Sequence, residues 1–395
     1  MKKTYNMDYY FMNDKYKISY FDILISNTNL TKEAILNDLG ISYMSYNRAK
    51  KNDTKGSLQL INKLSNYFNI KNVNLKKQNE YEELLNSIIY KFYYRSYNLK
   101  EFEPILIEYI NENTFLQPLF RLLLLLVRIV QLKSPHYILE EIKDEYEWLS
   151  QFKHSYFVSP FSEIFIIIEV LYSYDKLKEF DKEVVFSDGM RGLIYNVYTT
   201  NAYLSKKYDL CLYYARECRD YLIRDNNFER VILINLTYFS CLNMIGEYKK
   251  CMRESYYQLL HLIETDKPKE LIHSTKIHYL VACLGARDYK EVIETIEEFA
   301  TFSSTEYDFL FCASYAYDTK LFHKYLNKYE NDKKKFDDVD VEYNSLIIDY
   351  ITSTNKNKYK GLIKSMKYNI GFKDVLLNHF WFGRNFSTIS QMFFY

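Results

Sequence analysis

The stretch LTKEAILNDLGISYMSYNRAKKN, residues 30–52, decides the fold of the N-terminal part of the chain. Thr31 can cap a first helix, and Glu33 favours the positive end of that helix dipole. Gly40 permits a positive φ and ends the helix, and Ser42 can cap a second one. Helical spacing gives the first helix one apolar face, made of Ile35, Leu36 and Leu39, with Ile41 entering the core after the turn. The stretch therefore predicts two short helices joined by a tight turn.

The second of these helices has an inner and an outer face. Tyr46 and Ala49 are spaced to face inward. In a DNA major groove, Asn can pair with adenine, Arg with guanine and Lys with phosphate, and Met can touch a thymine methyl group. The resulting candidates for DNA contact are Thr31, Ser42, Tyr43, Met44, Asn47, Arg48, Lys51 and Lys55. Lys50 adds positive charge nearby, and a following helix is expected to cover the motif with Leu58, Ile61, Leu64 and Phe68.

Charge is distributed unevenly along the chain. Residues 1–77 carry 13 Lys and Arg against 6 Asp and Glu, whereas residues 78–395 carry 39 against 45, for a total net charge of +1. A basic head on a mildly acidic body is the pattern expected when only the head contacts nucleic acid.

Over roughly residues 18–70 the chain resembles the Cro/repressor type of helix-turn-helix. The matching features are Leu30, Thr31, Ile35, the run from Leu39 to Ser42 and the helix ending in Tyr67-Phe68-Asn69-Ile70. Leu36 departs from the small Ala usual in that family, and Lys50-Lys51-Asn52 stands where an acidic residue followed by Asn-Gly is common. The resemblance implies a DNA-binding head. The alternative is a four-helix cap that makes protein contacts only.

Behind the head, the sequence predicts long helices and internal repetition. Nine Gly and five Pro in 395 residues are few, which favours long helices over strands, and the length suggests two or three cores. A polar turn precedes Tyr208, Tyr248 and Tyr289, which lie 40 and 41 residues apart. Three residues after each Tyr comes a compact side chain: Cys211, Cys251 and Val292. These turns resemble those of tetratricopeptide repeats, although the usual period is about 34 residues. The resemblance implies a right-handed helical solenoid, and an irregular helical bundle is the alternative.

A solenoid of this kind curves and presents a concave groove, whose wall is formed by the first helix of each pair. With the turn Tyr as anchor, the groove positions are Asn196, Thr200 and Tyr203, then Leu236, Ser240 and Asn243, then Ile277, Val281 and Leu284. Asn side chains there can donate to and accept from a peptide backbone. Asn235 becomes a candidate if the register shifts by one residue. The alternative is that Asn196 and Asn243 are solvated surface residues.

Several function classes lack their sequence signatures. There is no GxGxxG, P-loop, HExxH or nucleophile elbow, so neither an enzyme nor a cofactor or metal site is expected. The run from Leu119 to Val130 is short and carries Arg121 and Arg128, which predicts a buried helix rather than a membrane span. The six cysteines form no CxxC pair and are expected to be reduced core residues. With no signal peptide evident, the sequence predicts a cytoplasmic protein.

These features together predict an all-α chain in three parts: a helix-turn-helix domain over residues 1–72, a helical-repeat sensor domain over 73–373, and a C-terminal capping or dimerisation segment over 374–395. This order resembles the peptide-sensing regulators of Gram-positive bacteria, the Rgg, PlcR and PrgX group, and more distantly the arbitrium receptors of phages. The resemblance implies a homodimer that controls transcription, binds a double-stranded DNA operator and holds a short signalling peptide in its groove. A non-enzymatic helical scaffold, whose head does not bind DNA, is the alternative.

Overall fold

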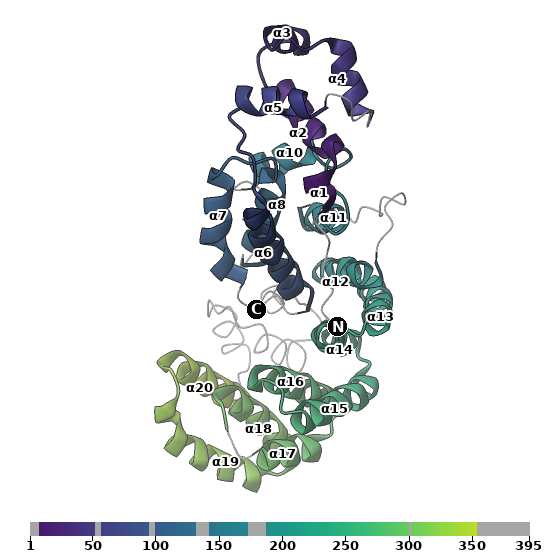
Figure 1. Cartoon of the computed structure of the whole chain (residues 1–395). Helices are drawn as coiled ribbons and strands as arrows, with labels where there is room; N and C mark the ends of the chain where they lie inside the picture. The colour runs from purple at the N-terminus through teal and green to yellow at the C-terminus, as the bar shows by residue number, and fades with distance from the viewer. Residues whose placement is uncertain are drawn as a thin grey trace. The chain divides into compact units, whose positions relative to one another are not determined.

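The computed structural model describes residues 8–51, 57–94, 99–131, 142–172, 187–299 and 302–353. Over these ranges the chain is helical, and the only strand-like feature described is an isolated bridge between Lys71 and Thr114 (Figure 1). The predicted all-α class is therefore confirmed. Among the described helices, none combines the length and the apolar character needed to span a bilayer.

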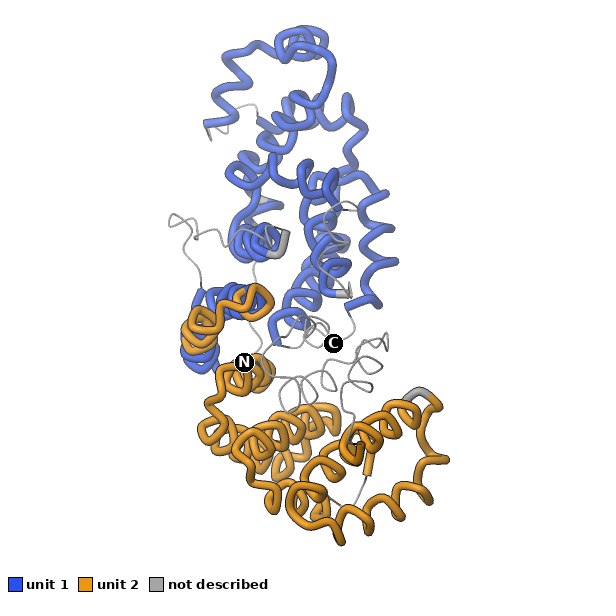
Figure 2. The backbone as a smooth tube through the Cα atoms, turned by 180° about the vertical axis from the view of Figure 1, so that it is seen from behind, with its two compact units in different colours: residues 1–201, 217–231, 394–395 blue, residues 202–216, 232–393 orange. Residues whose placement is uncertain are grey.

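The chain divides into two compact units (Figure 2). Among the described residues, unit 1 comprises those up to 201 together with 217–231, and unit 2 comprises 202–216 and those from 232 to 353. The division thus falls near residue 201, whereas the predicted boundary after residue 72 lies inside unit 1. The predicted boundary after residue 373 lies outside the described residues.

Unit 1 begins with the five helices of the head and continues with longer ones. Its helices are α1 (Asp8–Met12), α2 (Asp14–Ser26), α3 (Lys32–Asp38), α4 (Tyr43–Lys50), α5 (Ser57–Tyr67), α6 (Leu75–Tyr94), the 3-10 helix η1 (Leu99–Phe102), α7 (Glu103–Asn111), α8 (Gln117–Gln131), α10 (Lys143–Ser150) and α11 (Phe161–Tyr172). Three further helices, α12 (Asp188–Leu204), α13 (Tyr208–Arg224) and α14 (Phe228–Ile245), contribute residues to both units. The predicted buried helix is α8, whose apolar residues are almost all buried.

Helix α2 joins the head to the rest of unit 1. Tyr20 is fully buried and packs against the rings of Phe152 and Tyr156, while its hydroxyl donates to Gln117 Oε1 at 3.3 Å. At the end of α2, Asn27 Nδ2 donates to Gln151 Oε1 at 3.0 Å. Because α2 packs against the start of α8 and the segment between α10 and α11, the head shares its core with the rest of unit 1.

Unit 2 is built from antiparallel helices that follow one another along the chain (Figure 1). Besides its parts of α13 and α14, it contains α15 (Tyr248–Glu264), α16 (Lys269–Gly285), α17 (Tyr289–Glu298), α18 (Ser304–Tyr317), α19 (Thr319–Asp332), the 3-10 helix η2 (Lys333–Lys335) and α20 (Asp338–Thr352). Helix α16 packs against α15, α17 and α18, and its residues 275–284 are all buried. A helix buried on every face is a central element of the core.

The helix ends confirm the predicted turns and add two more. Lys206, Gly246 and Arg287 lie two residues before the turn tyrosines and have positive φ. Asn226 and Asp266, which lie between these turns along the chain, also have positive φ. At each of the five, the following N–H donates back across the turn to a helix carbonyl at 2.8–3.0 Å, the hydrogen bond of a Schellman motif. These turns recur every 20 or 21 residues. The 40-residue period therefore reflects two helices of 17 or 18 residues rather than long linkers.

Compact residues mark the places where helices approach closely. The predicted positions Cys211, Cys251 and Val292 are all fully buried. A methyl group placed on Gly285 of α16 would lie 2.3 Å from Cε1 of Tyr248, so the turn tyrosine packs directly on this glycine. The aromatic ring and the missing side chain together set the approach of α15 to α16.

Candidate functional site

The two short helices of the head begin and end as their sequence predicts. Thr31 caps α3 by accepting from the N–H of Ala34 at 3.2 Å, and Ser42 caps α4 by accepting from the N–H of Ser45 at 3.1 Å. Between them, Gly40 has a φ of +59°, and the Ile41 N–H donates to the Leu36 carbonyl at 2.8 Å. Local capping chemistry thus produces the turn that holds α4 at an angle to α3.

Helix α4 has the predicted inner and outer faces. Tyr46 and Ala49 are buried, whereas Ser42, Tyr43, Met44, Arg48 and Lys51 are exposed and Asn47 is half-buried. Met44 is 67% exposed. The sequence thus identified correctly which side chains of α4 face outward. Lys55 lies outside the described residues.

The expectation for the covering helix is wrong at one position. Leu58 is 67% exposed and does not pack over the motif, while Leu60, Ile61 and Leu64 form the buried face of α5. The packing of α5 against α2 and α4 determines which of its faces is buried. The spacing of apolar residues alone is compatible with Leu58 on either the buried or the exposed face. Phe68 is half-buried and stacks on Phe21.

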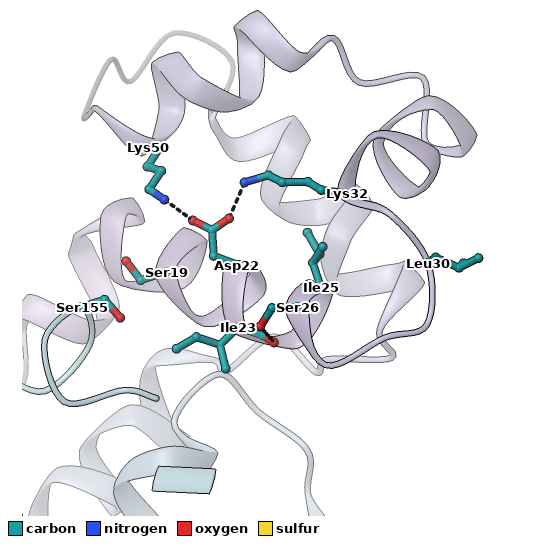
Figure 3. A pocket seen from close by; sticks show the side chains of 9 residues that line it. All are labelled: Ser19, Asp22, Ile23, Ile25, Ser26, Leu30, Lys32, Lys50 and Ser155. Atoms are coloured by element: carbon teal, nitrogen blue, oxygen red, sulfur yellow. Dashed lines mark hydrogen bonds and ion pairs between the residues drawn. The ribbon is translucent and has the colours of Figure 1, made fainter. Parts of the chain in front are cut away.

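A single carboxylate on α2 holds both helices of the motif (Figure 3). Asp22 pairs with Lys32 Nζ of α3 at 2.5 Å and with Lys50 Nζ of α4 at 2.7 Å, and it accepts from the Tyr46 hydroxyl at 2.7 Å. Burial opposes ionisation of Asp22, but the hydrogen bonds from these three side chains outweigh it and lower the pKa of the carboxyl group. Three helices are therefore oriented through one ionised group.

Sequence reasoning missed Asp22, although a signal was present. Ile18, Asp22 and Ile25 follow the i, i+4, i+7 spacing, so the carboxylate lies on the buried face of α2. A charged residue at such a position needs a partner. A cavity of about 440 Å³ adjoins it, lined by Ser19, Asp22, Ile23, Ile25, Ser26, Leu30, Lys32, Lys50 and Ser155 (Figure 3). Since both lysines of this cavity already pair with Asp22, it presents no unpaired cation.

Not every lysine of the head is available for phosphate. Lys32 and Lys50 both pair with the single carboxylate of Asp22, and Lys63 Nζ donates to the Leu39 carbonyl at 2.8 Å at the end of α3. Arg48 and Lys51 are exposed, and neither has an ion-pair partner within the described part of the chain. The basic groups left to a ligand on α4 are therefore these two, and the predicted contribution of Lys50 is reduced by its pairing.

The predicted groove residues are distributed between half-buried and buried positions. Asn196, Thr200, Asn235 and Leu236 are half-buried. Tyr203, Ser240 and Asn243 are buried, as are Ile277, Val281 and Leu284. The expectation that the buried residues line an open groove wall is wrong, because their side chains pack between helices. Helix α16, for example, is packed against α15, α17 and α18.

Two of the candidate asparagines connect neighbouring helices. Asn243 Nδ2 donates to the His278 carbonyl at 3.3 Å, and Asn235 Nδ2 donates to Gln258 Oε1 at 2.7 Å. Gln258 in turn donates to Thr275 Oγ1 at 3.1 Å. These amides therefore hold α14, α15 and α16 together. Peptide contact through the half-buried positions stays a prediction.

The cysteine side chains and one histidine are buried. All six cysteines are buried free thiols, in agreement with their predicted place in the core. Burial lowers the pKa of His278 to about 3. Within the described ranges, no group of three or more His, Cys, Asp or Glu side chains could hold a metal ion.

Comparison of the chain with protein-family models, with curated proteins and with solved structures finds no match. The geometry of its own residues is therefore what bears on its function.

Proposed function

We propose that this protein is a DNA-binding transcriptional regulator, in which the head formed by α1–α5 reads operator DNA as a helix-turn-helix. The observation that carries this proposal is the outer face of α4. Met44, Arg48 and Lys51 project from it without intramolecular polar partners in the described chain, and Ser42 caps its first turn. These are side chains suited to thymine, guanine and phosphate respectively.

The proposed mechanism places α4 in the major groove. Asp22 keeps α3 and α4 in a fixed relation to α2, so Arg48 and Lys51 approach DNA as parts of one rigid unit. A homodimer would present two heads to half-sites separated by about 34 Å, one turn of the double helix.

The helical repeats behind the head are the proposed sensor, a tetratricopeptide-like right-handed solenoid acting in the cytoplasm without cofactor or membrane. A short signalling peptide would contact the half-buried Asn235 and Leu236 of unit 2. A difference of about 1–3 kcal/mol in operator affinity between the free and peptide-bound forms is enough to switch transcription, since it corresponds to about 5–150-fold.

The test uses the full-length protein and duplex DNA selected from a random pool, with affinity measured by fluorescence anisotropy at several salt concentrations. Arg48→Ala is expected to weaken binding to the selected sequence by about 1–3 kcal/mol and to relax its specificity. Lys51→Ala is expected to weaken all duplexes about equally and to lower the salt dependence by about one phosphate contact. Lys334→Ala on η2, also an exposed cation, is the control and should change neither.

A protein-binding scaffold is the second candidate, favoured by the apolar side chains exposed on the head. Tyr43 and Met44 on α4 and Leu58 on α5 are each more than half exposed. If the full-length protein selects no duplex and shows no salt-dependent affinity, regulation through DNA is excluded and the scaffold remains.

A further inference from the structure

One helix of unit 2, α15, exposes several apolar side chains to solvent. The exposed side chains of α15 are Lys249, Arg253, Tyr256, Tyr257, Leu260, His261, Ile263 and Glu264, and helical spacing places them in a stripe along one side of the helix. The four apolar members are each more than a third exposed, and Tyr257 is 66% exposed. Contiguous apolar surface of this kind marks an interaction site.

The corresponding face of α17 shows what a solvated helix of this unit looks like. Its exposed side chains are all charged: Lys290, Glu294, Glu297 and Glu298. Lys290 and Glu294 pair at 3.3 Å along the helix, and Glu297 pairs with Lys324 at 2.8 Å. Both helices begin at a turn tyrosine, so the turn itself does not require an apolar outer face. Helix α13, the third helix of this kind, exposes Leu210, Tyr213 and Ile223.

The order of side chains along the α15 stripe is self-complementary. Basic Lys249 and Arg253 begin it, Tyr256 and Tyr257 occupy the middle, and acidic Glu264 ends it about 22 Å further along the helix axis. The midpoint between Lys249 and Glu264 falls between the two tyrosines. None of these three charged side chains has an ion-pair partner in the described residues.

We infer that α15 packs antiparallel against α15 of a second copy of this chain, across a two-fold axis at Tyr256 and Tyr257. Such an interface is isologous, so every contact occurs twice. Lys249 of each copy faces Glu264 of the other, and the aliphatic part of Arg253 faces Leu260. The charges at both ends fit only the antiparallel arrangement, because a parallel one would place Lys249 against Lys249.

The tyrosines supply most of the affinity and the charges set the register. Tyr is enriched among the residues that dominate binding energy at interface centres. Exposed ion pairs contribute only about 0–1 kcal/mol each, but like charges brought together disfavour the wrong register. A stable dimer buries about 800 Å² on each partner, so the α15 stripe forms the centre of a larger contact.

This inference deepens the proposed function, which needs two heads for each operator, by naming the helix that joins them. The first experiment measures the molar mass of the full-length protein in solution by light scattering, without DNA. Its outcome is therefore distinguishable from a failure to bind an operator. The wild type is expected to be dimeric at micromolar concentration, and Tyr257→Glu should weaken the dimer at least ~10-fold with an unchanged helical circular dichroism spectrum.

A charge exchange tests the antiparallel register. Glu264→Lys should weaken the dimer by setting two cations against each other, and Lys249→Glu should do the same with two anions. The double variant should restore the wild-type mass distribution. Glu298→Lys, on the charged face of α17, is the matched control and should leave the dimer intact.

Cross-linking locates the contact directly. Because all six native cysteines are buried, Tyr257→Cys introduces one accessible thiol, which a short bismaleimide should link into a covalent dimer. Lys290→Cys on α17 should give none. A monomeric wild type, a dimer insensitive to Tyr257→Glu, a double charge variant that is not restored, or equal cross-linking at both positions would overturn the inference.

Discussion

Asp22 shows how one side chain can fix the geometry of a pair of short helices. Its carboxylate pairs with the lysines of α3 and α4 and accepts from the Tyr46 hydroxyl, so it joins helices that contribute little apolar surface of their own. Helices as short as α3 and α4 are not stable in isolation and depend on such tertiary contacts. This anchoring fixes the position of α4, and with it that of Arg48, relative to α2.

Asp22→Asn is expected to lower the free energy of unfolding of the head by about 1–3 kcal/mol, because it removes two ion pairs and weakens one hydrogen bond. Since the folded state lowers the pKa of Asp22, this stabilisation is complete above its unfolded pKa, near 4, and is lost as the pH falls further. Urea denaturation followed by circular dichroism measures it. Asp38→Asn, at an exposed position of α3, is the control, and an equal effect of both changes would contradict the role of Asp22.

His278 predicts a second pH dependence at higher pH. Burial holds its pKa near 3 in the folded state, against about 6.5 in an unfolded chain. Between these values the unfolded state binds more protons, so stability falls as the pH decreases from about 6.5. This one group should remove about 2 kcal/mol between pH 7 and pH 5. His278→Gln should reduce the dependence of unfolding free energy on pH between pH 7 and pH 5. His261→Gln, at an exposed histidine, is the control and should leave it unchanged. The same pH dependence in His278→Gln as in the wild type would contradict the prediction.

The helices of the repeats end by a common device. Five turns carry a residue with positive φ and a hydrogen bond back across the turn, and their 20- or 21-residue spacing sets the length of each helix. Glycine occupies only one of the five, at Gly246. The others use Lys, Asn, Asp and Arg, which is why a search for glycine and proline alone finds too few turns.

Gly285→Ala is expected to destabilise unit 2 although alanine is the better helix former. The added methyl group meets the ring of Tyr248, and overpacking typically costs about 1–3 kcal/mol. In a Tyr248→Ala background the sign should reverse, because about 1 kcal/mol of helix propensity is then gained without a clash. Chemical denaturation of the four proteins checks this. Gly246→Ala is the control: it is strained by the positive φ of Gly246 and should lower the free energy of unfolding by about the same amount in both backgrounds. If the effect of Gly285→Ala did not depend on Tyr248, the proposed packing would be contradicted.

In the whole molecule, the head is part of a larger core. Tyr10 and Tyr20 reach into the aromatic cluster around Tyr156, and the hydroxyl of Tyr10 accepts from the Val158 N–H at 3.1 Å. The compact unit that contains the head accordingly extends to residue 201.

A fragment of residues 1–72 is therefore expected to be largely unfolded at temperatures where the full chain is intact, since it exposes the buried face of α2. Helical circular dichroism and amide exchange measure this. A fragment over residues 1–201 retains the packing partners of α2 and serves as the comparison. Cooperative unfolding of the short fragment near the midpoint of the longer one would show that the head is autonomous.

The amino-acid sequence alone accounts for the local features of this protein. The caps at Thr31 and Ser42, the turn at Gly40 and the exposed face of α4 were all predictable, because each depends on side chains within four residues of one another. The three turn tyrosines were predictable for the same reason. The all-helical class also followed from composition.

Other features depend on neighbours far away in the chain, and they required the folded molecule. The exposure of Leu58, the burial of Tyr203 and Asn243 and the pairing of Asp22 are set by helices that pack from a distance. An apolar or amide side chain at helical spacing can face either another helix or solvent, and the local sequence does not determine which. Periodicity in the sequence therefore predicts where helices form. Which of their side chains are buried or paired depends on the helices that pack against them in the folded chain.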